Sequence, residues 1–531
     1  MIMKKDNVRK NVFLETVYRV LTIIVSLCTA PYVSRVLGPD GIGIRSYTLS
    51  LESYFAIFAT LGTTIYGAME IARNRDNKEA YSKAFWGIEL ITILTTAICV
   101  VAWLTLAFSY VEYHIYLLII TIQLIAVAFD VSWFYAGLEK FKITIVTGIV
   151  FKIIAVVLVF CLIKKPSDLW LYILITCSSV LLSNLFMWVH LPRLLCKVSL
   201  KGLQFKRHLK STLAFFLPTV ASTLYMILDK TLIGLLVPGT VTEVLETGEE
   251  VVKKTAELEG GYYETAHQII NVVKIITFAG VSSVLGSRIS YLFKRGDIAQ
   301  IKVHIHESLN YVSFIGVGSL FGLLGVSKAF SSLFYGGGYE KTALFMMCLS
   351  CLPFVTGLSN CVSSHYFAPA NKQKRNLLII ASGAVLNVIL SVSLIPFLYG
   401  YGAIIGTCAA ELLITILSIC FSDGFFSFRM VLQHVWRKLI AGVFMLAWLL
   451  VFNHFLAPLF PPSLTFSVIS LAVEVLTGLI IFCLTLLALR DDGFKVVVSK
   501  FKKKSEAQQT EGPDAQKQRE NQGGLDENSS N

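Results

Sequence analysis

Charged residues are scarce in this sequence. Asp, Glu, Lys and Arg make up 15% of its 531 residues, hydrophobic residues make up 55%, and the mean hydropathy is +0.69. A typical soluble domain carries about 25% charged residues. Stretches of about twenty apolar residues, enough to cross about 30 Å of hydrocarbon, recur along almost the whole chain. The composition therefore excludes a water-soluble globule and predicts a polytopic membrane protein.

Motifs for metal or covalent chemistry are also missing. No group of His and Cys residues has the spacing of a metal site, and the eleven cysteines fall in predicted spans or on the predicted cytoplasmic side. The acidic DxD-type motif that a membrane glycosyltransferase would need near the first outer loop is absent. We therefore predict no enzyme, no catalytic residue, no metal, no cofactor and no disulfide framework.

The apolar stretches predict an all-α protein with about fourteen transmembrane helices. Six expected cores lie at 12–31, 46–66, 84–108, 115–137, 143–163 and 169–190. Six more lie at 212–237, 262–285, 308–327, 342–367, 377–397 and 402–421, followed by two at 437–456 and 465–489. The first run has no small-residue cleavage site after it, so we expect an uncleaved first helix.

Lys and Arg residues collect in alternate loops, as the positive-inside rule requires. With a cytoplasmic N-terminus, the basic groups at 4–10, 73–83, 140–142, 193–210, 288–302, 372–375, 429–438 and 495–504 all fall on the cytoplasmic side. A miscounted helix would invert every later loop, so the pattern predicts an even number of helices and two cytoplasmic termini. The net charge of +12 then reflects topology, and no nucleic-acid partner is expected.

An internal repeat divides the predicted helices into two halves. The segment Trp133–Lys142 aligns without a gap on His365–Lys374, and each segment ends one helix and begins the next. After a short shift in register, Lys152 aligns with Asn387. We therefore expect two parallel six-helix halves at 1–210 and 211–425, two additional helices within 426–495, and a disordered cytoplasmic tail at 496–531. The acidic segment Thr240–Gly261 is expected to be a solvated outer loop.

Polar residues follow one face of several predicted spans. Ionisable side chains inside a span cost roughly 2.5 to 3.5 kcal/mol, so each of them indicates a cavity, a partner or a function. Steps of three and four residues place the polar side chains of 262–285 on one face, and the first, second and seventh spans carry similar stripes. We expect these faces to line a water-filled vestibule, with Arg19, Lys230, His267, Asn271 and Lys274 as substrate-binding residues. Cations in a low dielectric attract phosphate oxygens strongly, so an anionic cargo head is expected.

Other interpretations of the intramembrane charges stay open. Arg19 follows Glu15 by four residues, and the two could simply satisfy each other. We expect Asp130 and Lys152, at similar depths on consecutive helices, to form a structural ion pair. Three further carboxylates could carry a coupling proton or sodium ion, or could be neutral or hydrogen-bonded; they are Glu52, Asp229 and Glu411.

Several segments together resemble one family of transporters. They are Ser34–Gly43, Asp130–Lys142, Leu228–Gly234, Gly261–Ala266 and Ser359–Ile395. Over roughly residues 10 to 490 the chain resembles the polysaccharide and oligosaccharide flippases of the multidrug/oligosaccharidyl-lipid/polysaccharide (MOP) exporter superfamily. It departs from them in having Ser287-Arg288 where relatives often have Pro-Arg, and in its acidic insertion.

The resemblance implies a MATE- and MurJ-like fold and a specific activity. The expected activity is translocation of undecaprenyl-pyrophosphate-linked oligosaccharide repeat units across the bacterial cytoplasmic membrane by alternating access, for capsule or O-antigen synthesis. Membrane lipids surround the protein, and a polymerase and glycosyltransferases are possible partners. Two alternatives stay open: a flippase for the lipid-linked peptidoglycan precursor, which differs only in cargo, and a drug or cation antiporter, which would want an acidic cavity.

Overall fold

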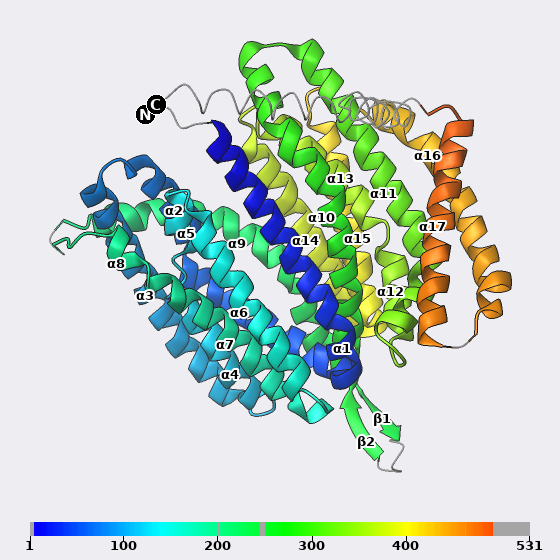
Figure 1. Cartoon of the computed structure of the whole chain (residues 1–531), viewed down its shortest axis with the longest axis horizontal. Coiled ribbons are helices and arrows are strands. Elements are labelled where there is room, and N and C mark those ends of the chain that lie inside the picture. The colour runs from blue at the N-terminus through cyan, green and yellow to red at the C-terminus, as the bar shows by residue number, and fades with distance from the viewer. Residues whose placement is uncertain (1–4, 200–201, 245–249, 462, 492–531) are drawn as a thin grey trace, which may run out of the picture. The chain divides into compact units, whose positions relative to one another are not determined.

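The computed structural model describes residues 5–199, 202–244, 250–461 and 463–491, and nearly all of them are helical (Figure 1). The longer helices up to the middle of the chain are α1 (Lys5–Thr60), α2 (Thr63–Asn74), α3 (Lys78–Ser109), α4 (His114–Val127), α6 (Phe141–Leu162), α7 (Leu169–Trp188), α9 (Phe205–Leu236) and α10 (Thr255–Arg295). They are followed by α11 (Ile298–Phe334), α12 (Glu340–Leu349), α13 (Leu352–Val362), α14 (Gln373–Leu398), α15 (Gly400–Cys420), α16 (Phe428–Val451) and α17 (Leu464–Ala488). Two short helices, α5 (Ser132–Gly137) and α8 (Leu191–Leu194), lie between them.

Eleven segments of the described chain are long and apolar enough to cross a membrane. One of them, Leu21–Asn74, contains a kink, because Gly38 has φ 72° and ψ 171° in the middle of α1 and precedes Pro39. That kink lies in the corner predicted between the first two spans. The helices α9 and α10 are not among the eleven, although they have 32 and 41 residues. This arrangement confirms an all-helical multi-pass protein and is compatible with fourteen spans.

The chain forms two compact units. The first contains the described residues within 1–272, 327–349 and 373–417, and the second contains those within 273–326, 350–372 and 418–491. Within the first unit, α4 packs on α3 and α7, and α6 packs on α7 (Figure 1). Within the second unit, α16 packs on α17. The predicted four-part division of the chain stays a prediction, since the unit boundary falls inside α10.

A close crossing of α1 and α10 forms one wall of the first unit. A Cβ atom built on Gly261 would lie 1.8 Å from the carbonyl oxygen of Pro39, and one built on Gly43 would lie 1.8 Å from that of Glu257. No side chain fits at either position. Small residues allow two helix backbones to approach in this way, and the crossing brings the polar face of α10 next to α1.

The two repeated corners have the same backbone geometry. In the first, Glu139 has φ 59° and the amide of Lys140 donates to the carbonyl of Tyr135 at 2.8 Å. In the second, Asn371 has φ 57° and the amide of Lys372 donates to Phe367 at 2.8 Å. A left-handed residue followed by a hydrogen bond to the fifth preceding carbonyl is a Schellman-type helix end. The structure therefore confirms the predicted local equivalence of these corners.

The acidic segment after α9 is more ordered than expected. It forms an antiparallel hairpin of β1 (Thr240–Val244) and β2 (Glu250–Lys254), after which α10 begins directly at Thr255 (Figure 1). Lys253 pairs with Asp40 at 3.2 Å, and Lys254 pairs with Glu112. The segment contains two strands and the start of α10 where a loop was predicted, and its strands still expose Val241 and Val252 to solvent.

Candidate functional site

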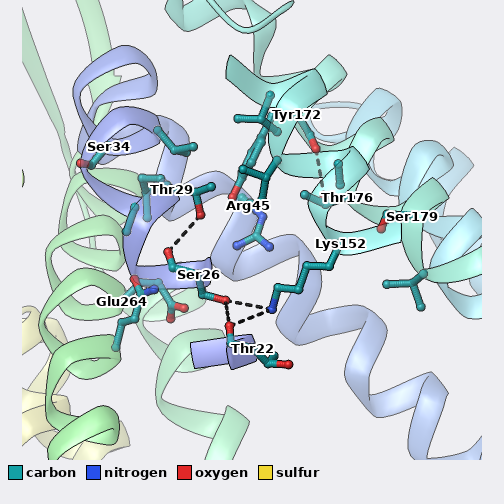
Figure 2. Close-up of a pocket in the computed structure, with 18 of the residues that line it drawn as sticks. Thr22, Ser26, Thr29, Ser34, Arg45, Lys152, Tyr172, Thr176, Ser179 and Glu264 are labelled. Carbon is teal, nitrogen blue, oxygen red and sulfur yellow. Dashed lines mark hydrogen bonds between the residues drawn. The ribbon is translucent and has the colours of Figure 1, made fainter. Parts of the chain in front are cut away.

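A polar cavity of about 630 Å³ lies within the first unit (Figure 2). Its walls come from α1, α6, α7, α9 and α10, with Tyr335 contributed from the end of α11. The polar lining includes Thr22, Ser26, Thr29, Arg45, Lys152, Tyr172, Thr176, Ser179, Ser183, Asn184, Lys230, Glu264, His267, Gln268 and Asn271. Hydroxyl and amide groups at this density can bind a hydrated or sugar-bearing ligand, whereas a lipid-facing groove would be apolar.

Lys152 enters the cavity from α6 and is held by neutral oxygen atoms. Its ammonium donates to the carbonyl oxygen of Thr22 at 3.1 Å and to the hydroxyl of Ser26 at 3.0 Å (Figure 2). Neither acceptor carries a charge. The positive charge of Lys152 is therefore oriented by α1, and no carboxylate of the described residues pairs with it, so we expect it to attract an anion.

Arg45 brings a second cation into the same space from the part of α1 beyond the kink. Its guanidinium carbon lies 5.1 Å from the centroid of the Tyr172 ring, which is a cation–π distance (Figure 2). Its Nε atom is buried and has no hydrogen-bond partner among the described residues. A planar guanidinium with an unused donor suits phosphate recognition.

Lys230 and Glu264 form the charged pair of the cavity wall. The Lys230 ammonium lies 2.6 Å from Oε2 of Glu264, and both side chains are about one-fifth exposed, at 23% and 22%. The hydroxyl of Ser46 donates to the same carboxylate oxygen at 3.1 Å. The lining thus carries three cations and one carboxylate among its described residues, so its formal charge is positive.

Of the five predicted substrate-binding residues, some line the cavity and others do not. Lys230, His267 and Asn271 line the cavity, and the His267 ring and the Asn271 amide lie 3.1 Å apart. Lys274 is half-buried on α10 but belongs to the second unit. Arg19 lies in α1, and its side chain is outside the described residues. The structure therefore brings together three of the five.

The predicted ion pair between Asp130 and Lys152 is corrected by the structure. Asp130 accepts a hydrogen bond from the amide of Ser132 at 2.9 Å and so caps the start of α5. Lys152 instead reaches α1, as described above. A free backbone amide at a helix start is a local partner for a carboxylate, and similar depth on consecutive helices did not decide the pairing.

The three predicted coupling carboxylates are buried and lie outside the cavity lining. Glu52 accepts from the Gln123 amide at 3.3 Å, and Glu411 is 8% exposed. Asp229 has the richest surroundings: one of its oxygens, Oδ2, accepts from the hydroxyls of Tyr263 at 2.7 Å and Thr407 at 2.5 Å.

Oxygen atoms without partners gather on the helices next to Asp229. Its other oxygen, Oδ1, has no hydrogen-bond partner among the described residues, and the same is true of Oδ1 of Asn387 and the hydroxyl of Ser391, both fully buried. The Asn387 amide nitrogen donates to Thr407 at 3.2 Å. Buried unsatisfied oxygens cost free energy unless something binds them.

Comparison with known proteins identifies the family. The family described as polysaccharide biosynthesis protein matches residues 8–293, which is more than half of the chain. The chain belongs to this family. A curated relative of this polysaccharide-biosynthesis protein, named "Putative O-antigen transporter", comes from Escherichia coli K12 and is 24% identical over 424 residues, covering 78% of the chain and 97% of the relative.

Solved structures show the fold of this polysaccharide-biosynthesis protein. The lipid II flippase MurJ in an inward closed conformation matches with a TM-score of 0.63 at 15% identity, covering 90% of this chain and 99% of that one. An inward-facing multidrug resistance MATE family transporter of the MOP superfamily matches with a TM-score of 0.56 at 14% identity, covering 75% and 93%. The predicted MATE- and MurJ-like fold is therefore confirmed.

Sequence reasoning missed two features of the cavity. It did not single out Arg45, because this residue precedes the predicted span 46–66 and looked like an ordinary flanking cation. It also assigned Lys152 to a structural role. The available signal was the alignment of Lys152 with Asn387, since Lys152 lines the polar cavity and Asn387 is a buried polar residue of the same unit.

Proposed function

We propose that this protein moves undecaprenyl-diphosphate-linked oligosaccharide repeat units from the inner to the outer leaflet of the bacterial cytoplasmic membrane. The observation that carries the proposal is that cations outnumber carboxylates in the polar cavity of a polysaccharide-biosynthesis protein. The relative named as an O-antigen transporter supports this cargo class, because O-antigen repeat units are anionic lipid-linked sugars when they are attached to a diphosphate.

Each part of such a cargo has a matching environment. The diphosphate carries its charge next to the sugar, and the guanidinium of Arg45 and the ammonium of Lys152 supply two cations for it. The hydroxyls and amides of α1 and α7 supply hydrogen bonds for sugar hydroxyls, whereas the polyprenyl tail stays in the bilayer. Lys274 and Arg19 remain proposed contributors along the path of the head group.

Transport needs no bond to be made or broken, so the proposed function is not enzymatic. The cavity must open to the inner leaflet to bind the cargo and then to the outer leaflet to release it. We place the coupling cation, a proton or sodium ion, at Asp229, because unpaired buried oxygens of Asn387 and Ser391 accompany it. Glu52 is a weaker candidate, because its Oε1 is also unpaired but its hydrogen-bond partner Gln123 adds no further unpaired atom among the described residues. Glu411 is weaker because neither of its oxygens is among the buried unpaired atoms of the described residues.

The proposed membrane orientation has both termini in the cytoplasm. Single cysteines at Val252 in the hairpin and at Asp76 in a basic loop, each in a cysteine-free background, test it; both native side chains are exposed. Val252→Cys is expected to react with an impermeant maleimide in intact cells, and Asp76→Cys only after permeabilisation. The reverse result would invert the proposed topology.

Depletion of the protein in its host tests the cargo. Short diphosphate-linked repeat units are expected to accumulate on the inner leaflet, where mass spectrometry of extracted lipids measures them, and long polysaccharide is expected to disappear. Lys152→Gln should fail to restore the polysaccharide at normal abundance. Accumulation of the peptidoglycan precursor instead would favour the lipid II alternative, and raised drug sensitivity with normal glycan would favour an antiporter. A glycosyltransferase and a polymerase are the partners that this function requires.

A further inference from the structure

Glu264 is the one carboxylate among the described residues that line the cavity. Its Oε2 atom receives both the ammonium of Lys230 and the hydroxyl of Ser46, at 2.6 and 3.1 Å. The ion pair with Glu264 therefore neutralises Lys230, which is one of the three cations that line the cavity. A carboxylate at this position opposes the binding of an anionic ligand, so a purely attractive phosphate site would not be expected to contain it.

The pair occupies a junction of three helices. Lys230 comes from α9, Glu264 from α10 and Ser46 from α1. Lys230 also lines a second, much smaller pocket, together with Gly43 and Gly260. Gly43 belongs to the close crossing of α1 and α10 and has no room for a side chain, and a Cβ atom on Gly260 would lie 3.5 Å from the Cα of Gly43. Lys230 thus lines both pockets, whereas Glu264 lines only the larger one.

We infer that Glu264 is an internal counter-ion that the diphosphate of the cargo displaces from Lys230. This inference rests on the proposed function. An arriving diphosphate engages Arg45 and Lys152 first, because among the described residues neither is in ion-pair contact with a carboxylate, and it then competes with Glu264 for Lys230. When the cargo leaves, Glu264 pairs with Lys230 again. The carboxylate is therefore a specificity-determining residue that weakens cargo binding and speeds release.

Competition of this kind has a clear physical signature. The contribution of Lys230 to the free energy of binding equals its attraction for the ligand minus the cost of separating Lys230 from Glu264. Removing the carboxylate charge removes that cost, so the ligand binds more tightly. A carboxylate that only holds the helices together would give the opposite result, because its loss would loosen the site.

Binding of inorganic pyrophosphate to the purified full-length protein in lipid nanodiscs tests the inference. Calorimetry without magnesium is expected to show about tenfold tighter binding by Glu264→Gln than by the parent protein, which corresponds to about 1.4 kcal/mol. Glu264→Asp retains the charge but is one methylene shorter, so a smaller increase is expected. Lys230→Gln should weaken binding. The matched control is Glu79→Gln, which breaks a Lys83–Glu79 pair of the same 2.6 Å length outside the cavity and should change nothing.

Transport kinetics provide the second readout. In vesicles with the lipid-linked repeat unit, Glu264→Gln should show a lower KM together with a lower kcat, because cargo binds well and leaves slowly. Unchanged or weaker pyrophosphate binding by a folded Glu264→Gln protein, with Glu264→Asp behaving alike, would overturn the counter-ion role and leave the cavity proposal intact. If the parent protein binds pyrophosphate no better than Lys152→Gln and Arg45→Gln, both the counter-ion role and the proposed phosphate site fail.

Discussion

Two lysines inside the helical bundle differ in what accepts their hydrogen bonds. In the first unit, Lys152 donates only to neutral oxygens of α1 and faces the cavity. In the second unit, Lys438 is 1% exposed and donates to the Asp491 carboxylate at 3.2 Å, to Asn310 at 3.3 Å and to the carbonyl of His434 at 2.7 Å. Within the part of the chain that the structure describes, Lys152 has no carboxylate partner, whereas Lys438 is paired with one.

The difference separates a binding role from a structural one. A buried lysine with its own carboxylate needs no ligand, because its charge and all its donors are satisfied. A lysine held by neutral acceptors in a hollow keeps its attraction for an external anion. The four predictions below test this distinction, from the largest expected effect to the smallest.

Charge changes at Lys152 should have the largest effect on transport. Lys152→Gln is expected to slow glycan export about tenfold or more, since a hydrogen bond to a charged group contributes about 1.5 to 3 kcal/mol. Lys152→Glu should slow it further through repulsion, and Lys152→Arg should retain much of the activity. Glycan export is measured in depleted cells that express each variant, and the abundance of the variant protein is measured as the control. If the Lys152→Gln variant exports glycan at the parental rate, Lys152 does not contribute to cargo binding.

Breaking the Lys438 pair should instead affect folding. Lys438→Met removes the ammonium from which the buried Asp491 carboxylate accepts a hydrogen bond, so the free energy of unfolding is expected to fall by roughly 3 to 5 kcal/mol. The double variant Lys438→Met/Asp491→Leu should recover most of this loss because no charge remains. Thermal unfolding in detergent measures the stability of the single and the double variant. If the single variant unfolds like the parent protein yet stops export, Lys438 has a transport role and the distinction between the lysines is wrong.

Gly261→Ala tests how much the cavity wall depends on backbone contact rather than charge. The added Cβ would meet the Pro39 carbonyl, so α1 and α10 must separate, and overpacking of this kind costs about 1 to 3 kcal/mol. Lower thermal stability and reduced export are expected. The control is Gly337→Ala, where nothing lies within 4 Å of the new Cβ. Equal behaviour of the two variants would show that the close crossing is not required.

A third lysine, Lys372, should have the smallest effect because it is paired at the surface. Its hydrogen bond to Asp423 raises the pKa of Lys372 above its ordinary value of 10.5, and it also donates to Tyr366 at 2.8 Å. A raised pKa in the folded state means that the stabilisation is fully present below pH 10.5 and is lost as the pH rises through the folded-state pKa. The small difference in melting temperature between parent and Lys372→Gln should therefore be constant near neutral pH and shrink in strong alkali. A difference that grows with pH would contradict the assigned cause.

The sequence alone determined the features that depend on local pattern and composition. Apolar length requires a bilayer, and this holds whatever the helices pack against. The repeated corners at Glu139 and Asn371 were recognisable because a Schellman-type end uses hydrogen bonds between residues five apart, so matching sequences give matching geometry. The polar face of α10 followed from helical periodicity, since its residues lie three or four positions apart.

Only the tertiary structure decided which charges are paired. Lys152 meets Ser26 across 126 positions of the chain, and Glu264 meets Ser46 across 218. Such contacts depend on helix crossings, and the closest of these rests on the glycines at 43 and 261. Spacing along one helix carries no information about the facing helix. For this reason the sequence could propose an anionic cargo, whereas the roles of Arg45, Lys152 and Glu264 emerged only when five helices were brought around one cavity.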